Sequence, residues 1–505
     1  MMLTYKLLSS FLLASSVSVT ALASAPIYKA NVADSLLTPD RSQSKYLGEV
    51  HMVDGFPSEE TSRKAFDFLD TSRAVQLYTS GMPMASMYAM LEGNAKVGVE
   101  ANRTVGITEQ LMDARSIWLT PNTTTPYISA EVDVKNGPVV VEVGSPVIGL
   151  LNDAYFHYVA DIGMGGPDKG QGGKYLIVGD AYDGEIPEGY FVYRTSTYRH
   201  WLLIRAVAEP NSSLEDTIAK FKRGFKMYPL AEAAKPKANN YVNLSKHHSS
   251  TIHSADHSFY NEINAVIQYE PANSGDSEII GLADALGIKK GKTFSPDERM
   301  LKIFSEAATI ANAASRATLY RPRNPEMYIY ENKPWITSTV QSHEFLNENG
   351  ARILDDRMAF HFYATGITPF MVDPQVGSGS VYAVTTMDQK GDMLSGDKTY
   401  IVTLPEGIPA KDFWSLMVYD NQTRSILETN QKSGGVDSLQ GDPVVNDDGS
   451  ITIYFSSKAP EGKEQNWVQT MPGKGFNVIL RLYGPLQSWF DKSWQPSGLE
   501  VFSKK

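Results

Sequence analysis

The chain has no cysteine among its 505 residues. Disulfides, zinc–thiolate sites and cysteine nucleophiles are therefore excluded, and packing has to stabilise the fold. The chain also lacks a basic region: the net charge is −11, and no block of five like charges occurs. Because binding to phosphate groups requires a basic face, nucleic acid is not an expected partner.

Long apolar runs are absent after the first residues, so we expect no stable insertion into a membrane. At the start, Lys6 precedes an apolar, serine-diluted run from 7 to 22, and Ala21-Leu22-Ala23 has the small residues of a cleavage site. Ala23-Ser24-Ala25 is a competing site, and an uncleaved anchor is the alternative. We expect a signal peptide and a periplasmic or secreted mature chain.

The pattern of apolar residues divides the chain into helical and β-rich parts. Short β-branched and aromatic runs separated by Gly, Pro and Asp predict two β-sandwiches with a helical region between them. We expect a multidomain α+β chain, with a signal peptide (1–23), an N-terminal lead and helices (24–115), a small immunoglobulin-like β-sandwich (116–209), a helical region (210–365) and a jelly-roll-like β-sandwich (366–505).

Several helix boundaries can be predicted from capping residues and helix breakers. Residues 59–91 have helical spacing, and Gly81 and Pro83 predict a break into two short helices. Ser213 and Ser295 are the expected N-caps of later helices. Residues 345–365 predict one further helix.

The sequence strings that are most specific for a protein family are spread over most of the chain. They include LTPNTTTPY (119–127), GGPDKGQGGKY (165–175), GIKKGKTFSPDER (287–299), GDKTY (396–400) and the stretch from Ala459 to Trp494. Together they resemble a bacterial family in which domain of unknown function 1254 is followed by domain of unknown function 1214. The resemblance implies the two sandwiches and the helical domain given above. It brings no known reaction and no catalytic residues.

The glycine-rich stretch from Gly165 to Tyr175 is a candidate ligand loop. Its five glycines would let backbone amides approach an anionic or hydroxylated ligand, beside Asp168, Lys169 and Lys174. The alternative is a shaped β-loop in which glycines adopt positive φ and lysine pairs with Asp168.

A second candidate is the run from Thr195 to Trp201, which combines hydroxyls, a cation and aromatic rings. Tyr198 could stack on a sugar, and His200 could move a proton. Strand alternation puts Tyr198 and His200 on one face and Trp201 on the other, so the whole set cannot line one pocket. A core aromatic with a surface cation is the alternative.

Four of the nine histidines lie between His247 and His257. His253 and His257 are the metal candidates, because their i, i+4 spacing would place them on one helix face. No HExxH or GxSxG motif accompanies them, and His-rich polar loops bind metals adventitiously. We therefore assign no metal and expect no cofactor.

These observations favour a protein that binds a small polar ligand, sugar-like or anionic, in a cleft between domains. The alternatives are a hydrolase that uses Asp or His residues of that cleft and an envelope scaffold with protein partners only. The aspartates considered for hydrolysis lie near aromatics and are Asp153, Asp161, Asp420 and Asp491. The sequence leaves open whether the chain is an enzyme or a homo-oligomer. The candidate ligand residues are Asn122, Thr125, Tyr127, Asp168, Lys169, Lys174, Tyr198, His200, Trp414, Tyr419 and Arg481.

Overall fold

The structure is a computed structural model that describes residues 32–144, 146–208, 212–245, 247–337 and 342–502. The predicted signal peptide lies outside these residues. The chain divides into two compact units, Met1–Phe68 and Leu69–Lys505. Within the described ranges, no helix combines the length and the apolar character needed to cross a bilayer.

The first unit contains a small antiparallel sheet. Its elements are η1 (Asp34–Leu36), β1 (Arg41–Ser44), β2 (Gly48–Val53) and β3 (Phe56–Pro57). The hydroxyl of Thr61 accepts a hydrogen bond of 3.0 Å from the backbone N–H of His51, which ties β2 to the start of the following helix.

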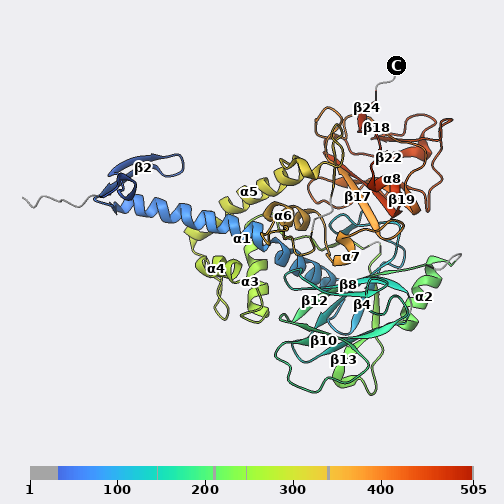
Figure 1. Ribbon diagram of the computed structural model, residues 1–505, viewed down its shortest axis with the longest axis horizontal. Helices are drawn as coiled ribbons and strands as arrows, with labels where there is room; N and C mark the ends of the chain where they lie inside the picture. The colour runs from blue at the N-terminus through green and yellow to red at the C-terminus, as the bar shows by residue number, and fades with distance from the viewer. Residues whose placement is uncertain (1–31, 145, 209–211, 246, 338–341, 503–505) are drawn as a thin grey trace, which may run out of the picture. The chain divides into compact units, whose positions relative to one another are not determined.

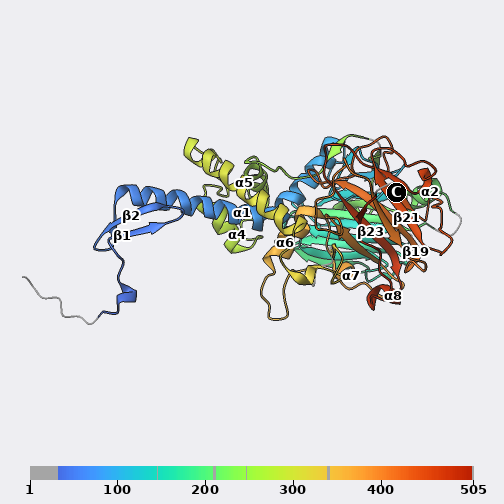
Figure 2. The ribbon, with the colours of Figure 1, turned by 90° about the horizontal axis from the view of Figure 1, so that it is seen from above.

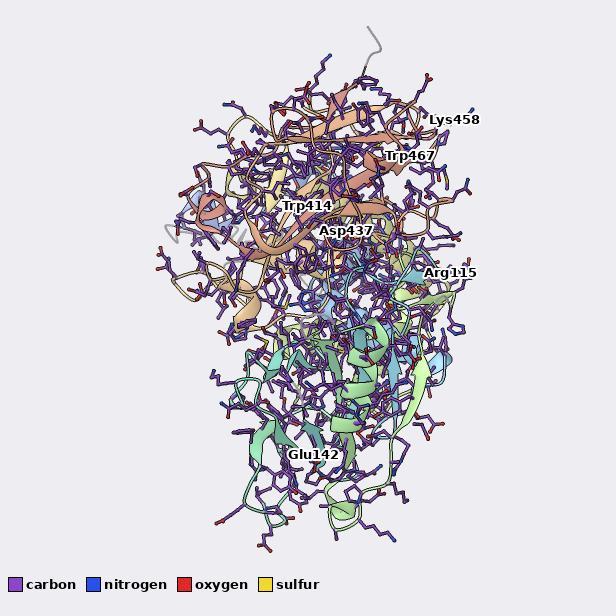
Figure 3. The ribbon with its side chains drawn as sticks, turned by 90° about the vertical axis from the view of Figure 1, so that its right-hand side faces the viewer. Arg115, Glu142, Trp414, Asp437, Lys458 and Trp467 are labelled. Carbon is purple, nitrogen blue, oxygen red and sulfur yellow. The ribbon has the colours of Figure 1, made fainter. Side chains whose placement is uncertain are left out.

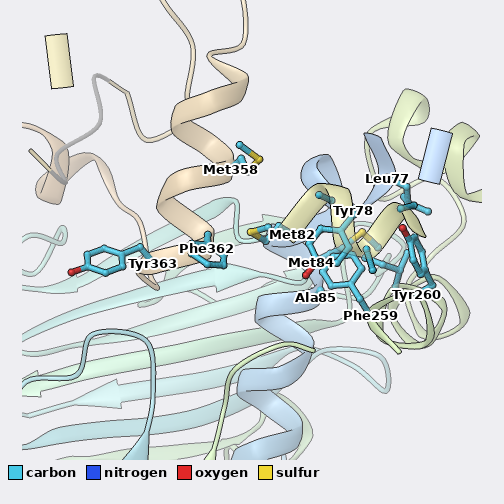
Figure 4. Close-up of a cluster of buried hydrophobic side chains, with 14 of the residues drawn as sticks. Leu77, Tyr78, Met82, Met84, Ala85, Phe259, Tyr260, Met358, Phe362 and Tyr363 are labelled. Carbon is cyan, nitrogen blue, oxygen red and sulfur yellow. The ribbon is translucent and has the colours of Figure 1, made fainter. Parts of the chain in front are cut away.

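That helix, α1 (Glu59–Lys96), is continuous over 38 residues, so the predicted break is wrong. Pro83 lies inside it and removes one backbone hydrogen bond, which costs about 3 kcal/mol in an isolated helix. Burial of the surrounding turns offsets this cost: Tyr78, Met82 and Met84 are almost completely inaccessible. Figure 4 shows them packed beside Phe259 in one hydrophobic cluster.

Two sheets make up the N-terminal β-rich part of the second unit. A six-stranded sheet has the order β14-β4-β6-β12-β8-β9 and a four-stranded sheet the order β11-β10-β7-β13, and side chains of both form one buried cluster. A small parallel pair, β5 and β15, lies apart from them in the hydrogen-bonding pattern. The bounds are β4 (Thr104–Ile107), β5 (Ser116–Ile117), β6 (Tyr127–Asp133), β7 (Val139–Val143), β8 (Val147–Asp153), β9 (Tyr158–Gly163), β10 (Gly173–Gly179), β11 (Phe191–Thr195), β12 (Arg199–Ala206), β13 (Lys226–Pro229), β14 (Asn240–Asn243) and β15 (Ser249–Ser250).

Helices follow in the middle of the chain, and their caps test the sequence predictions. Ser213 caps α2 and shares a reciprocal capping box with Asp216, as predicted. Asp297, and not Ser295, caps α5, because its carboxylate accepts the N–H of Met300 at 2.8 Å. The bounds are α2 (Leu214–Gly224), η2 (Leu230–Glu232), α3 (Phe259–Tyr269), α4 (Ser277–Ala285), α5 (Glu298–Tyr320), η3 (Pro325–Met327), α6 (Leu354–Tyr363) and α7 (Pro369–Val372).

The helix predicted over 345–365 is confined to α6 and its first half is a turn. Asn347 explains the difference, because its side-chain oxygen accepts the N–H groups of Asn349 and Ala351 and competes with helical bonding. Gly350 completes the turn at φ 78°.

The C-terminal part again contains two sheets. A five-stranded antiparallel sheet has the order β16-β17-β23-β19-β20, and a four-stranded sheet has the order β22-β21-β18-β24. Both contribute to one core that includes Trp335, Tyr400 and Phe476. The bounds are β16 (Trp335–Thr337), β17 (Ser380–Thr385), β18 (Tyr400–Leu404), β19 (Ala410–Asp420), β20 (Gly435–Asp437), β21 (Ile451–Ser456), η4 (Glu464–Asn466), β22 (Trp467–Gln469), β23 (Phe476–Pro485), α8 (Gln487–Phe490) and β24 (Glu500–Val501).

Within the second unit, the two β-rich parts meet near α7. Figure 1 shows α7 between β17 and β8, and Figure 2 shows it again beside the sheets. Phe370 of α7 lies against Gly165, where an added Cβ would come within 3.1 Å of its ring. This junction is therefore closely packed, and it forms one edge of the cavity described below.

Two glycine substitutions, one at the end of β9 and one in α4, test the assigned backbone conformation. Gly163 has φ +82°, and an added Cβ would lie 2.1 Å from the carbonyl oxygen of Val147. We expect Gly163→Ala to lower the free energy of unfolding by at least about 2 kcal/mol. Gly281 of α4 faces open space, so Gly281→Ala should raise it by about 0.5 to 1 kcal/mol. Urea unfolding measures both, and a Gly163→Ala protein as stable as the parent would contradict the assigned backbone.

Candidate functional site

A cavity of about 220 Å³ lies where the outer faces of the six-stranded and five-stranded sheets approach each other. Residues from both β-rich parts line it, together with the segment that contains α6 and α7. Most of the lining is aromatic or aliphatic. The polar side chains in it come from Thr120, Asn122, Tyr127, Asp161, Arg205, Tyr363, Thr365, Thr368, Ser380, Tyr382, Arg481 and Tyr483.

One wall is the face of the six-stranded sheet that points away from its own core. Along β12, Trp201, Leu203 and Arg205 line the cavity, whereas the alternate residues Leu202 and Ile204 are buried in the core cluster. The strand register extends this face sideways. Tyr127 and Ile148 flank Arg205, and Leu150 connects Leu203 to Asp161.

The opposite wall is built in the same way by the five-stranded sheet. Ile479, Arg481 and Tyr483 alternate along β23 with core residues and line the cavity. In register, Tyr382 of β17 pairs with Arg481, and Ser380 pairs with Tyr483. Two independent alternation patterns therefore create one shared interior surface.

The loop from Leu119 to Asn122 crosses from the N-terminal part to the C-terminal sheet and is held there by hydrogen bonds. Arg481 donates to the carbonyl of Thr120 at 2.8 Å and to the phenol of Tyr419 at 2.6 Å. That phenol donates to the carbonyl of Pro121 at 2.8 Å, and the amide of Asn122 donates to the hydroxyl of Tyr483 at 2.5 Å. The loop is thus part of the cavity wall.

Two arginines at the cavity have no acidic partner among the described residues. Arg481 is only 4 % exposed, and its acceptors are all neutral: the Tyr419 hydroxyl, the Thr120 carbonyl and the sulfur of Met417. Arg205 is half-buried, and its guanidinium carbon lies 5.7 Å from the ring centre of Tyr483. The guanidinium carbon of Arg481 lies at the same distance from the ring centre of Tyr382. Buried charges are normally paired, so an arginine at this cavity without an ion-pair partner is a candidate to contact an anion.

Asp161 is the one carboxylic acid in the described lining of this cavity. Burial raises its pKa to about 6, and hydrogen bonds with Thr368 and Tyr158 oppose this shift only in part. The group is therefore poised to exchange a proton near neutral pH.

Three of the residues predicted from the sequence, Asn122, Tyr127 and Arg481, are brought together in the cavity wall. Tyr419 does not line the cavity but supports its wall, because its hydroxyl accepts from Arg481 and donates to the carbonyl of Pro121. Thr125 lies next to Asn122, with its hydroxyl 3.5 Å from the Asn122 amide.

The glycine-rich stretch lies outside the lining except for its contact with Phe370. Asp168 organises the loop by accepting hydrogen bonds from Gly172 N–H at 3.0 Å and from the Tyr175 hydroxyl at 2.8 Å. Lys169 adopts φ 51° in the same turn. Lys174 is exposed and forms an ion pair of 3.3 Å with Glu142, which is labelled in Figure 3 far from Trp414.

Tyr198, His200 and Trp414 also lie away from the cavity. His200 is fully buried, with its ring nitrogens at 3.1 Å from the Val132 carbonyl and 2.8 Å from the Thr195 hydroxyl, and burial lowers its pKa. Trp414 belongs to the C-terminal core. The ring of Tyr198 packs edge-on against Tyr269.

The histidine pair proposed from i, i+4 spacing does not share a helix face, because α3 begins only at Phe259. His253 is buried, and burial together with the positive charge of Arg424 lowers its pKa to about 3, whereas His257 is exposed. The residues that the structure describes contain no group of three or more side chains placed to hold a metal ion.

Arg205, Tyr382, Tyr483 and Phe370 line the cavity but were not among the sequence candidates. For two of them, the spacing in the sequence could have indicated the position. Arg205 follows Trp201 at i+4 in a strand and must share its face, and Tyr483 follows Arg481 at i+2. Tyr382 and Phe370 have no such signal, because only the pairing of distant segments brings them here.

Comparison with known proteins agrees with this two-part organisation. Residues 102–229 match the family described as Protein of unknown function (DUF1254), and residues 379–487 match Protein of unknown function (DUF1214). No curated protein matches the chain.

Two solved structures match most of the chain at low sequence identity. The VPA0106 protein from Vibrio parahaemolyticus is 16% identical with a TM-score of 0.52, and the match covers 86% of this chain and 100% of that one. An uncharacterised protein from Burkholderia cenocepacia is 13% identical with a TM-score of 0.39, over 88% and 91% of the two chains. At these identities the first comparison supports the α+β fold alone.

Replacing Asp161 tests its titration. Because its pKa of about 6 exceeds the ordinary 3.8, the neutral acid stabilises the fold below about pH 4, and this stabilisation is lost as the pH rises through 6. Relative to Asp161→Asn, the parent protein should lose about 1 to 3 kcal/mol of unfolding free energy between pH 4 and pH 7.5. Urea unfolding of both proteins measures this, and a difference that does not change with pH would refute the assignment.

Proposed function

The chain joins a DUF1254 domain to a DUF1214 domain, and we propose that it binds a small organic anion in the cavity between them. The ligand is a carboxylate with an apolar body. Its carboxylate contacts Arg205, and its apolar part lies on Trp201, Leu203 and Phe370.

One observation carries this proposal: Arg205 lines a mostly apolar cavity and has no ion-pair or hydrogen-bond partner among the described residues. A guanidinium in such surroundings gains strongly from a carboxylate, because the charge-assisted hydrogen bonds form in a low dielectric. Tyr127 is the cross-strand neighbour of Arg205 and offers a phenol to the same anion.

The lining favours an organic acid over a sugar. A sugar presents many hydroxyl groups, each of which requires a polar partner when buried. Here most of the lining is apolar, and two of its polar side chains are already engaged: Asn122 donates to Tyr483, and Arg481 donates to Thr120 and Tyr419. The volume of about 220 Å³ is below the ~300 to 1,000 Å³ typical of sites for drug-sized ligands, so the ligand is small.

A binding experiment with two matched probes tests the proposal. By isothermal titration, 3-phenylpropionate should bind, whereas its neutral amide should bind at least about tenfold more weakly. Arg205→Gln should weaken binding of the acid by about 10- to 100-fold, because it removes the charge-assisted bond and leaves the cavity shape intact.

Lys174→Gln is the control, since it also removes one positive charge, from a lysine that is exposed, pairs with Glu142 and does not line the cavity. Its affinity for 3-phenylpropionate should equal that of the parent. Equal affinity for acid and amide, or an Arg205→Gln protein that binds like the parent, would rule out an anion site. Failure of every small acid to bind would favour a scaffold with protein partners only.

A hydrolase is the second candidate, and the raised pKa of Asp161 favours it. Asp161 would act as a single general acid or base on a bound ester. Glycoside hydrolysis by two carboxylates has less support, because Asp161 has no acidic neighbour in the described lining. Turnover of phenyl esters that disappears in Asp161→Asn would identify this activity, and unchanged turnover in that variant would assign it elsewhere.

We further propose that the mature chain acts in the periplasm or outside the cell after cleavage of the signal peptide. Lys6 and the apolar run from 7 to 22 support this. The immunoglobulin-like and jelly-roll assignments belong to the same proposal. They are supported by the way paired sheets contribute to single cores in each β-rich part.

A further inference from the structure

A second, smaller cavity of about 50 Å³ lies beside α6. Its lining comes from α1, from the turn at Tyr155–His157, from α4, from residues 343–345 and from α6 itself. The first cavity uses Phe360 and Tyr363 of α6, whereas this one uses Arg357 and His361. The two cavities therefore draw on different side chains of the same helix.

Arg357 is a buried cation without a partner at this second cavity. Its side chain is 9 % exposed, and its Nε atom has no hydrogen-bond acceptor among the described residues. No carboxylate in the described chain forms an ion pair with it. Burial lowers its pKa to about 10, which still leaves it charged at neutral pH. An uncompensated buried charge of this kind costs several kcal/mol.

His361 is the second buried group without a full set of partners. It is 2 % exposed, and its Nδ1 donates to the carbonyl of Arg357 at 2.8 Å. Since a carbonyl only accepts, the proton of the neutral ring is on Nδ1, and Nε2 presents a lone pair. This Nε2 atom has no partner among the described residues. Burial and the charge of Arg357 lower the pKa of His361 to about 3, which keeps the ring neutral.

Two aromatic rings pack against His361. The ring centre of Phe156 lies 5.4 Å from that of the imidazole, and the ring centre of Phe345 lies at 5.1 Å. Such surroundings lower the local dielectric and strengthen any polar contact made inside.

Charged groups of both signs surround the entrance. Arg352 and His343 line it, with Arg352 donating to the carbonyl of Glu344 at 2.7 Å. His157 lies 3.3 Å from Asp153, which raises the pKa of the imidazole against the effect of burial. Asp276 and Glu344 are the acids of the rim and are exposed. The interior of the cavity thus presents a cation and a lone pair, and the acids stay in solvent.

We propose that this second cavity is a binding site for a small protonated oxyanion, of which hydrogen phosphate is the type. The guanidinium of Arg357 donates to an anionic oxygen, and Nε2 of His361 accepts the O–H of the same ion. Both buried groups are satisfied by one occupant. The volume restricts that occupant to an ion of a few atoms, because one water already needs about 10 to 15 Å³ of such space.

Titration with inorganic phosphate in a phosphate-free buffer at pH 7 tests this site. The parent protein should bind phosphate with a Kd below about 1 mM, and Arg357→Met should bind it at least about tenfold more weakly. Arg205→Gln, which alters the first cavity, should bind phosphate like the parent. Loss of phosphate binding in Arg205→Gln but not in Arg357→Met would place the ion in the first cavity and overturn the proposal.

Sulfate provides the matched probe for His361, because it has the shape of phosphate but no proton at neutral pH. Phosphate should bind at least about tenfold more tightly than sulfate, and His361→Phe should reduce this preference by removing the acceptor. Equal affinities of the parent for the two ions would refute the role of the Nε2 lone pair.

A measurement on the unaltered protein covers the case in which Arg357→Met does not fold. In ¹⁵N-histidine spectra, the Nε2 resonance of His361, identified by its absence in His361→Phe, should shift when phosphate is added. A resonance that stays in place at about 10 mM phosphate, ten times the expected Kd, would show that water alone occupies the cavity.

Discussion

The guanidinium of Arg481 connects the two β-rich parts of the second unit. It projects from β23 and donates to the carbonyl of Thr120, a residue of the N-terminal part, while Tyr419 links it to Pro121. Because a buried arginine must fill its donor positions, this loop is held against the C-terminal sheet. The position of Asn122 and the closure of the cavity both depend on that contact.

Both cavities contain arginine side chains that have no ion-pair partner among the described residues. In the first, Arg205 and Arg481 lie among phenols and apolar side chains, and in the second, Arg357 lies beside a neutral imidazole. Folding an unpaired charge into such surroundings lowers stability, and an anion that binds the folded chain restores it. Binding of the proposed anions would therefore raise stability, and α6 contributes side chains to both cavities.

The arrangement also separates the roles of residues that look equivalent in the sequence. His200 and Trp201 are adjacent, yet His200 lies in the core of the N-terminal part and Trp201 lines the cavity, because successive residues of a strand face opposite sides. In the glycine-rich loop, Asp168 likewise has a structural role, because its carboxylate accepts a hydrogen bond from the backbone of its own turn. A polar side chain therefore does not indicate a ligand site when local hydrogen bonds already occupy its donors and acceptors.

The sequence by itself determined the family, the alternation of the β-rich and helical parts, the capping box at Ser213, and the cavity residues Asn122, Tyr127 and Arg481. Those features depend on local periodicity or on strings of neighbouring residues. Only the tertiary structure decided that α1 continues through Pro83, that Asp297 caps α5, and that Arg205 faces Tyr483 across the cavity. Burial outweighs the local cost of proline, and pairing of strands distant in sequence is what brings isolated charges together.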